Sequence, residues 1–138
     1  LPTFPPELFA MVFPKNSMKA KQFQKGVDQL AQEGAIQVYR NQYNEVVIGA
    51  VGQLQFEVFE YRLKNEYNVE IVNTPLPYQF IRWVVNKDID VKTLNLSSDT
   101  KYVEDLKGNT LLLFSNTWGI NWATERNSGL ELAEFSKN

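Results

Sequence analysis

The chain has 138 residues, of which 43% are hydrophobic and 22% are charged, and its net charge is −2. This composition is that of one globular domain with its own core, without the basic excess typical of nucleic-acid-binding proteins. The absence of cysteine and histidine from the sequence excludes disulfides, thiolate chemistry, histidine general bases and the usual zinc ligands.

The N-terminal residues resemble neither a signal peptide nor a normal translation start. They run Leu1-Pro2-Thr3-Phe4-Pro5-Pro6 and have the character of a linker. No apolar run in the sequence approaches the roughly 20 residues needed to span a membrane. We therefore expect residues 1–138 to be one domain of a longer protein that does not act in a membrane.

The first half of the chain predicts a β-α-β-β-α-β series, because apolar residues alternate in the short segments and recur every three to four residues in the long ones. Asn16 or Ser17 can cap the first helix, and Gly34 ends it. This order is that of the ferredoxin-like, or split βαβ, fold. We expect an antiparallel sheet with both helices on one face and with the first and third strands parallel at its centre. The predicted elements are strand 7–13, helix 17–33, strand 36–40, strand 45–51, helix 54–66 and strand 69–72.

Four lysines gather at the start of the first predicted helix: Lys15, Lys19, Lys21 and Lys25. Lys21 and Lys25 project one turn apart from the face opposite the apolar residues, and no acidic residue lies among the four. A solvated helix face explains this pattern without any function. The alternative is contact with a phosphate backbone, because four lysines at one helix start could neutralise several phosphates.

The helix predicted at 54–66 carries two apolar stripes on nearly opposite sides, when wound at about 100° per residue. A helix that lies on a sheet with its back to water needs only one. We expect the second to be covered by residues 77–138 or by another domain of the longer protein. The first is the Leu54 stripe, made of Leu54, Val58 and Tyr61. The second is the Phe59 stripe, made of Phe56, Phe59 and Leu63, and we expect it to be the one that needs this cover.

Residues 77–138 predict a β-rich extension that contains one helix, so the fold class is α/β in the α+β sense, with a ferredoxin-like unit at 1–76. Gly108 marks a hairpin turn, and Thr117 can cap the helix. Trp118, Trp122 and Phe135 form an aromatic group that we expect to help cover the Phe59 stripe. The predicted elements of this half are strand 78–85, a helical turn near 91–94, strands 102–106 and 110–114, helix 117–126 and a returning strand at 130–135.

Catalytic motifs are missing from the sequence. There is no Gly-x-x-x-x-Gly-Lys-[Ser/Thr] phosphate loop, and residues 86–90 lack the aspartate that a guanine-reading Asn-Lys-x-Asp motif requires, since Ile89 stands in its place. Glu57 and Glu60 lie one helical turn apart, but an exposed helix edge offers no cleft for paired acids. We predict no catalytic residue, no GTP-binding residue and no metal site in this chain.

Residues 50–58, Ala-Val-Gly-Gln-Leu-Gln-Phe-Glu-Val, carry the densest part of a family resemblance, which continues through Arg-Leu-Lys at 62–64 and Glu-Tyr-Asn-Val-Glu at 66–70. This run closely resembles the C-terminal domain of the peptide chain release factor 3 family, which are bacterial translational GTPases. The likeness extends upstream through residues 33–39 and more weakly downstream through Arg82-Trp83 and residues 121–126.

The resemblance implies that the chain is a non-catalytic domain that docks a longer GTPase on the ribosome in the cytoplasm after peptide release. Such a protein promotes the departure of the class I release factor, and GTP with Mg²⁺ would bind its N-terminal domain. The implied partners are ribosomal RNA, ribosomal protein and the GTPase and β-barrel domains of the parent, with the class I release factor as an indirect partner. The implied contact residues are Lys15, Lys19, Lys21 and Lys25 for the ribosome, and Phe56, Phe59 and Leu63 for interdomain packing.

Two other functions fit the same fold. One is a free-standing RNA-binding module, although the central strands carry no RNP-type aromatic motif. The other is a small-molecule regulatory domain whose ligand would lie at a domain or subunit interface. Aromatic residues between 102 and 122 could stack nucleobases, but core or interdomain packing is their more usual role.

Overall fold

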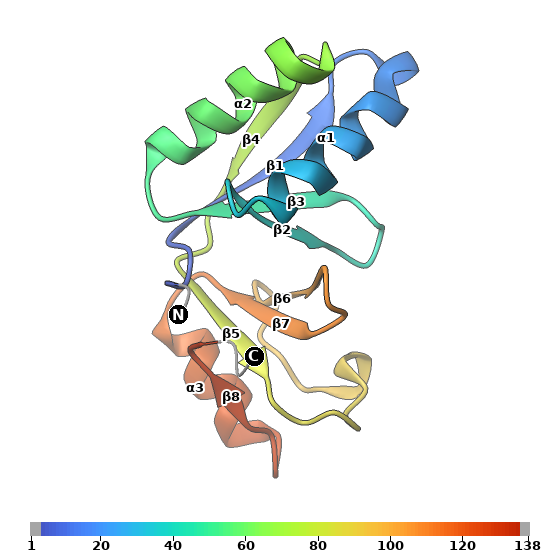
Figure 1. Ribbon diagram of the computed structural model, residues 1–138. Helices are drawn as coiled ribbons and strands as arrows, with labels where there is room; N and C mark the ends of the chain where they lie inside the picture. The colour runs from blue at the N-terminus through green and yellow to red at the C-terminus, as the bar shows by residue number, and fades with distance from the viewer. Residues whose placement is uncertain (1–3, 136–138) are drawn as a thin grey trace.

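The computed structural model describes residues 4–135, so the first and last three residues of the predicted domain lie outside it. Its strands form one eight-stranded antiparallel sheet in the order β4-β1-β3-β2-β6-β7-β5-β8 (Figure 1). The strands are β1 (Leu8–Pro14), β2 (Gln37–Arg40), β3 (Val46–Ala50), β4 (Ile71–Leu76), β5 (Phe80–Val84), β6 (Lys101–Asp105), β7 (Thr110–Phe114) and β8 (Leu132–Ala133). The helices are α1 (Ala20–Gln32), α2 (Gln53–Tyr67) and α3 (Thr117–Arg126), with short 3₁₀ helices η1 (Ser17–Lys19) and η2 (Val91–Thr93).

The predicted ferredoxin-like arrangement is confirmed in the strand order β4-β1-β3-β2 and in the position of α1 and α2 on one face of these strands (Figure 1). One detail of the prediction was wrong, because β1 and β3 are antiparallel neighbours. The crossover through α1 leads from β1 to β2, and these two strands run in the same direction with β3 between them. The hairpin from β2 to β3 then reverses the chain, so β3 opposes β1.

Side chains alternate between the two faces of this half of the sheet, and both faces are buried. In β1, Ala10 and Val12 pack beneath the helices, whereas Phe9 and Met11 belong to the opposite face. All five residues of β3, Val46–Ala50, are buried for the same reason.

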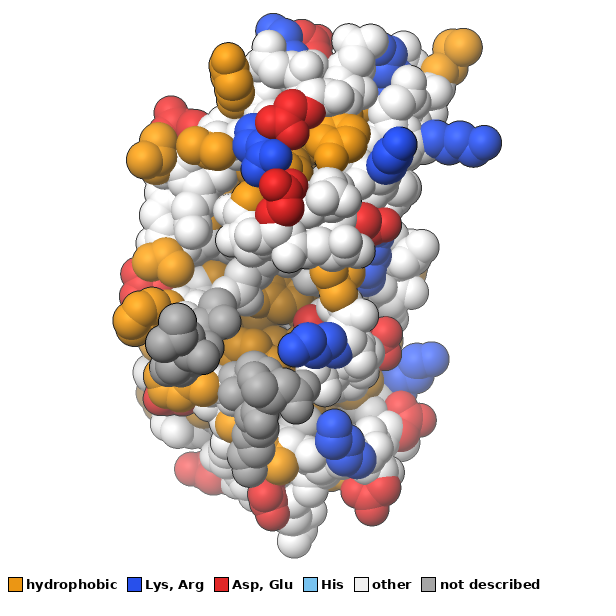
Figure 2. Space-filling model, in the orientation of Figure 1, with side chains coloured by type: hydrophobic (Ala, Val, Ile, Leu, Met, Phe, Trp, Pro, Cys, Tyr) orange, Lys and Arg blue, Asp and Glu red, His pale blue; other side chains and the backbone are white. Residues whose placement is uncertain are grey.

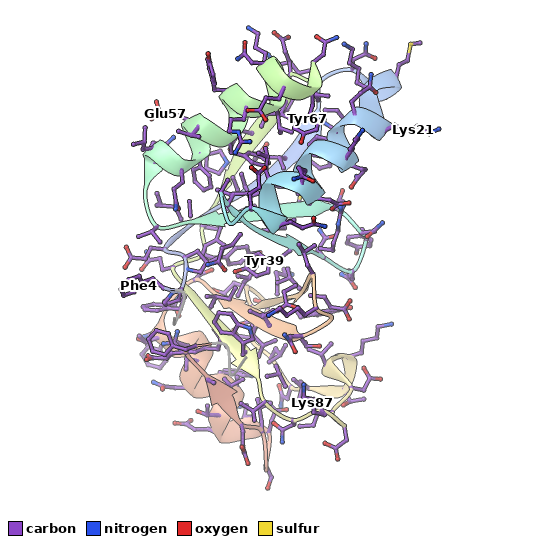
Figure 3. The ribbon with its side chains drawn as sticks, in the orientation of Figure 1. Phe4, Lys21, Tyr39, Glu57, Tyr67 and Lys87 are labelled. Atoms are coloured by element: carbon purple, nitrogen blue, oxygen red, sulfur yellow. The ribbon has the colours of Figure 1, made fainter. Side chains whose placement is uncertain are left out.

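The second half of the chain covers the opposite face. Strands β5, β6 and β7 contribute Ile81, Val103, Leu111 and Leu113 to a core shared with Phe9, Tyr39 and Val47. Figure 3 shows Tyr39 at this junction between the two halves. Because residues of β1 and β5 meet here although the two strands are not neighbours in the sheet, the sheet folds back on itself. Burial and, to a smaller extent, the charge of Asp105 raise the pKa of Tyr39 well above its usual value.

The Phe59 stripe of α2 packs onto its own sheet and onto α1. Phe56, Phe59 and Leu63 are 6%, 0% and 0% exposed and share a core with α1 and with β1, β2, β3 and β4. The expectation that residues 77–138 cover this stripe was wrong, and the expected role of these three side chains in interdomain packing is excluded because they have almost no exposed surface. The Leu54 stripe is the uncovered one.

Gly26 explains why α1 lies against this side of α2. A Cβ atom at position 26 would lie only 2.6 Å from Leu63 Cδ2 and 2.9 Å from Tyr67 Cγ. The absent side chain therefore allows a close approach of the two helices over the Phe59 stripe.

Helix α3 lies on the outer face of β7, where Ala123 packs with Leu112 and Phe114. The predicted aromatic group does not cover α2, because Trp118 and Phe135 are 83% and 45% exposed. Trp122 instead stacks against the guanidinium of Arg126, whose Cζ lies 3.6 Å from the ring centroid.

The cap of α3 is Asn116 rather than the predicted Thr117. Its Oδ1 accepts a hydrogen bond from the backbone N–H of Gly119 at 3.1 Å, which satisfies one of the free donors of the first turn. In the first half, Asn16 caps η1 through its Oδ1 and the N–H of Met18, whereas α1 itself follows Lys19 and has no side-chain cap, so the predicted cap is confirmed only for the 3₁₀ turn that precedes α1.

Candidate nucleic-acid interface

The four predicted lysines divide into two groups. Lys15 and Lys19 lie in the connection between β1 and α1, next to the C-terminal end of α2, whereas Lys21 and Lys25 lie on α1. Lys15, Lys21 and Lys25 are exposed, and Lys19 is half-buried. Among residues 4–135, none of the four forms an ion pair.

Lys15 and Lys19 line a pocket of about 280 Å³, and Lys64 from the last turn of α2 joins them there. The Lys19 ammonium donates a hydrogen bond to the backbone carbonyl of Asn68 at 2.8 Å, and Lys64 pairs with Glu70 at 3.5 Å. The C-terminal carbonyls of a helix attract cations. Lys19 and Lys64 therefore complete the end of α2, and the sequence analysis missed Lys64, although it belongs to the Arg-Leu-Lys run of the family resemblance.

Lys21 and Lys25 project outward from α1. Figure 3 shows Lys21 on the side of the molecule opposite Glu57 of α2, and Figure 2 shows Lys and Arg side chains on this side over α1. The first turn of α1 contains no acidic residue. Cations near a helix N-terminus oppose the helix dipole, at a cost of about 0.3–1 kcal/mol at an exposed position. The helix dipole thus disfavours a cation at Lys21, whereas Lys25 lies in the second turn, beyond the range of this effect.

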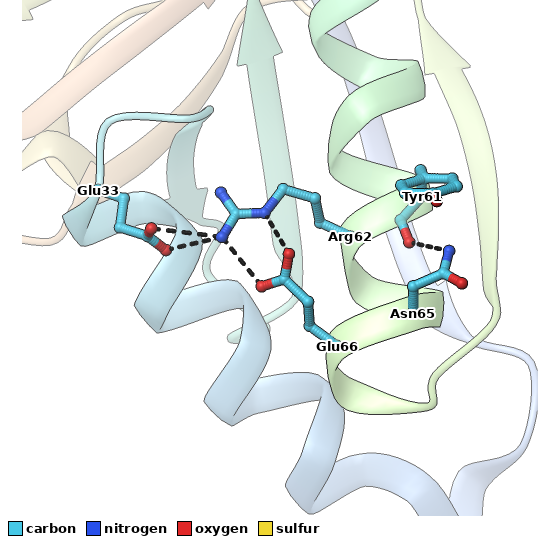
Figure 4. Close-up of polar contacts among 5 residues, drawn as sticks. All are labelled: Glu33, Tyr61, Arg62, Asn65 and Glu66. Carbon is cyan, nitrogen blue, oxygen red and sulfur yellow. Dashed lines mark hydrogen bonds and ion pairs between the residues drawn. The ribbon is translucent and has the colours of Figure 1, made fainter.

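Other cations near the helices are already neutralised. Arg62 on α2 donates to Glu66 at 2.7 and 2.9 Å and to Glu33, which follows α1, at 3.2 and 3.3 Å (Figure 4). The hydrogen bond from Arg62 lowers the pKa of Glu66, and the two carboxylates raise the pKa of Arg62. Arg40 similarly lies 3.6 Å from Asp28. Within residues 4–135, the lysines at the start of α1 that remain for an external anion are Lys15, Lys21 and Lys25.

Other predicted features offer no chemical site. Glu57 and Glu60 are exposed on α2 and do not line a pocket with each other. Within residues 4–135, no group of three or more acidic side chains is placed to hold a metal ion. The same described part of the chain contains no helix with the length and apolar character required to cross a membrane.

Comparison with known proteins gives the same family as the sequence motif. Residues 1–124 match the family model described as "Class II release factor RF3, C-terminal domain". The curated relatives are each named "Peptide chain release factor 3". The relative from Lactobacillus delbrueckii subsp. bulgaricus is 49% identical over 135 residues, which are 97% of this chain and 25% of the relative.

Two further relatives agree with this result. The protein from Staphylococcus saprophyticus is 50% identical over 127 residues, or 91% of this chain and 24% of the relative. That from Listeria welshimeri is 49% identical over 136 residues, or 98% of this chain and 26% of the relative. The chain thus spans about a quarter of the length of the curated relatives that it matches.

Proposed function

Since the chain belongs to the family of class II release factor RF3 C-terminal domains, we propose that it docks a longer translation-termination factor on the ribosome. The observation that carries this proposal is the exposed lysine pair Lys21 and Lys25 on the outer face of α1, neither of which forms an ion pair within residues 4–135. Phosphate groups of ribosomal RNA are the anions that this pair would meet, with Lys15 beside it.

The division of labour follows from the motifs. The chain contains no phosphate loop, so in this proposal GTP and Mg²⁺ bind another domain of the parent protein, and this domain is non-catalytic. The parent uses GTP in the cytoplasm to promote the departure of a class I release factor. This domain supplies contacts to ribosomal RNA and protein and changes its position relative to the GTPase domain between nucleotide states.

The Leu54 stripe is the face that we propose for packing against the GTPase and β-barrel domains of the parent. Leu54, Val58 and Tyr61 are 70%, 43% and 67% exposed on one side of α2, and exposed apolar patches usually mark an interaction surface. This side carries many of the hydrophobic side chains visible on the left of Figure 2, away from the lysines on α1. A division of the domain into units 1–76 and 77–138 is part of the same proposal.

A free-standing RNA-binding module is less well supported. Such modules stack bases on the open face of the four-stranded sheet. Here that face contains Phe9, Tyr39 and Val47, which are buried beneath the second half of the chain.

Ribosome binding by the 138-residue chain tests the proposal. The test variant replaces both Lys21 and Lys25 with Gln. The control variant replaces both Lys87 and Lys107 with Gln and so changes the net charge by the same amount. Lys87 lies at the opposite end of the molecule from Lys21 (Figure 3). At low salt the α1 pair should weaken binding and the control pair should not. An equal effect of both pairs would reduce the interaction to net charge and contradict a defined docking face.

A further inference from the structure

A pocket of about 510 Å³ opens between the turn that joins β2 and β3, the segment between β5 and β6, and the start of β6. Tyr43, Tyr78 and Tyr102 line it: Tyr43 lies on the turn between β2 and β3, Tyr78 on the connection between β4 and β5, and Tyr102 on β6. Tyr43 is 73% exposed, whereas the other two rings are half-buried. The pocket contains none of the four lysines at the start of α1 and no residue of either stripe of α2.

The turn that carries Tyr43 is held in one conformation. Asn41 Oδ1 accepts hydrogen bonds from the backbone N–H groups of Tyr43 at 3.0 Å and Glu45 at 2.9 Å, and its Nδ2 donates to Glu45 Oε1 at 2.9 Å. Asn44 adopts the left-handed conformation with φ 61°, which asparagine tolerates better than most residues. These bonds fix the backbone that carries the exposed Tyr43 ring, so little backbone freedom is lost when the ring makes a contact.

Apolar side chains, including Met11, Leu76 and Leu113, line much of the rest of the pocket, together with polar groups, lysines and the carboxylate of Glu45. The Tyr102 hydroxyl donates to Gln42 Oε1 at 3.1 Å, and within residues 4–135 the amide N–H groups of Gln42 donate to no acceptor. Lys92 and Lys101 are exposed and line the pocket. A second pocket, of about 380 Å³, shares four residues with the first and adds Arg40, Asn44 and Glu104. Because they share these residues, the two pockets are adjacent and form one groove.

We propose that this groove binds an unpaired nucleotide of an RNA strand. The base stacks on the tyrosine rings, the free amide of Gln42 meets an acceptor on the base edge, and Lys92 and Lys101 meet the flanking phosphates. A volume of about 510 Å³ lies within the usual range of about 300–1,000 Å³ for small-molecule sites. The choice of RNA rests on the proposed docking to the ribosome.

The combination of aromatic rings with exposed lysines favours a nucleotide over an apolar side chain of a partner protein. An apolar side chain would contact the rings and the apolar lining, but the exposed Gln42, Lys92 and Lys101 would stay in water and add nothing to its binding. A base with its phosphates satisfies the rings, the amide and the cations together.

Titration of a fluorescently labelled short single-stranded RNA with the 138-residue chain at low salt tests the inference. The variants are Tyr43→Ala, Tyr43→Phe and the control Tyr61→Ala, which removes another exposed tyrosine on α2. Stacking of one base on an aromatic side chain corresponds to about 5- to 150-fold in affinity. Tyr43→Ala should weaken binding by an amount in this range, whereas Tyr43→Phe, which keeps the ring, and Tyr61→Ala should bind like the wild type.

Ribosome binding by the same variants separates this inference from the proposed function. Equal oligonucleotide affinity of wild type and Tyr43→Ala overturns the nucleotide site, whether or not the chain binds the ribosome. Ribosome binding that depends on Tyr43 but is not competed by the oligonucleotide would assign the groove to a ribosomal protein and also overturns it. If replacement of Lys21 and Lys25 abolishes ribosome binding and Tyr43→Ala affects neither ribosome nor oligonucleotide binding, the docking proposal is supported and the nucleotide site is overturned.

Discussion

Two leucines on the same helix provide a direct test of which face of α2 is buried. Leu63 is 0% exposed, in the core formed with α1 and the sheet, whereas Leu54 is 70% exposed on the opposite stripe. Truncation of a core leucine to alanine costs about 2–5 kcal/mol, because it removes buried methyl groups and leaves a cavity. A surface substitution usually changes stability by less than about 0.5 kcal/mol. The same chemical change should therefore have very different effects at the two positions.

Urea unfolding followed by far-ultraviolet circular dichroism measures this difference. For an m-value near 2 kcal/mol/M, within the usual range, Leu63→Ala should lower the midpoint by about 1–2.5 M urea, and Leu54→Ala should leave it nearly unchanged. Equal and large losses in the two variants would show that the Leu54 stripe is also buried, by self-association or by another part of the chain. A small loss in Leu63→Ala would refute the packing of α2 described above.

Three further predictions concern individual contacts. Gly26→Ala gains about 1 kcal/mol of helix propensity, but the new Cβ would lie 2.6 Å from Leu63 Cδ2, and such overpacking costs about 1–3 kcal/mol. The variant should therefore destabilise the chain, and by less when Leu63 is also replaced by Ala. A double-mutant cycle measured by urea unfolding gives this coupling. Asn116→Ala should cost about 1 kcal/mol by removing the cap of α3, whereas Thr117→Ala should be nearly neutral, and equal losses in thermal unfolding would return the cap to Thr117. The pKa of Glu66 is lowered in the folded chain by its hydrogen bond from Arg62, so this contact stabilises the fold above the unfolded pKa of Glu66 and is lost as the pH falls through the lowered value. Between about pH 7 and pH 3 the wild type should thus lose more stability than Arg62→Gln, and parallel pH profiles would contradict this.

The ferredoxin-like half could be predicted from the sequence because its strands and helices carry clear apolar periodicity and short turns. The apolar periodicity correctly predicts two stripes on α2, but it does not predict which stripe faces the sheet. Both stripes consist of large apolar side chains, so the pattern does not distinguish them. Gly26 decides the matter through the close approach of α1, and this contact joins residues on different helices. The residue pattern of a single helix therefore does not predict this contact.

The burial of the second face of the sheet could be predicted only in part from the sequence. The continuous apolar run Val46–Ala50 is typical of a strand that is buried on both faces, and the structure shows this burial. The partner strands, however, come from the second half of the chain, whose polar residues 86–100 carry little periodicity. The groove lined by Tyr43, Tyr78 and Tyr102 is further from prediction, because it joins three segments that are distant in sequence.

The salt dependence of ribosome binding tests the proposed lysine contact most directly. Each phosphate contact adds about 0.7–0.9 to the slope of log affinity against log salt concentration. Replacement of Lys21 and Lys25 by Gln should therefore reduce the slope measured for the 138-residue chain by about 1.5, whereas replacement of Lys87 and Lys107 should leave it unchanged. An unchanged slope in the Lys21 and Lys25 variant would show that this face of α1 does not meet the RNA backbone and would contradict the proposed docking.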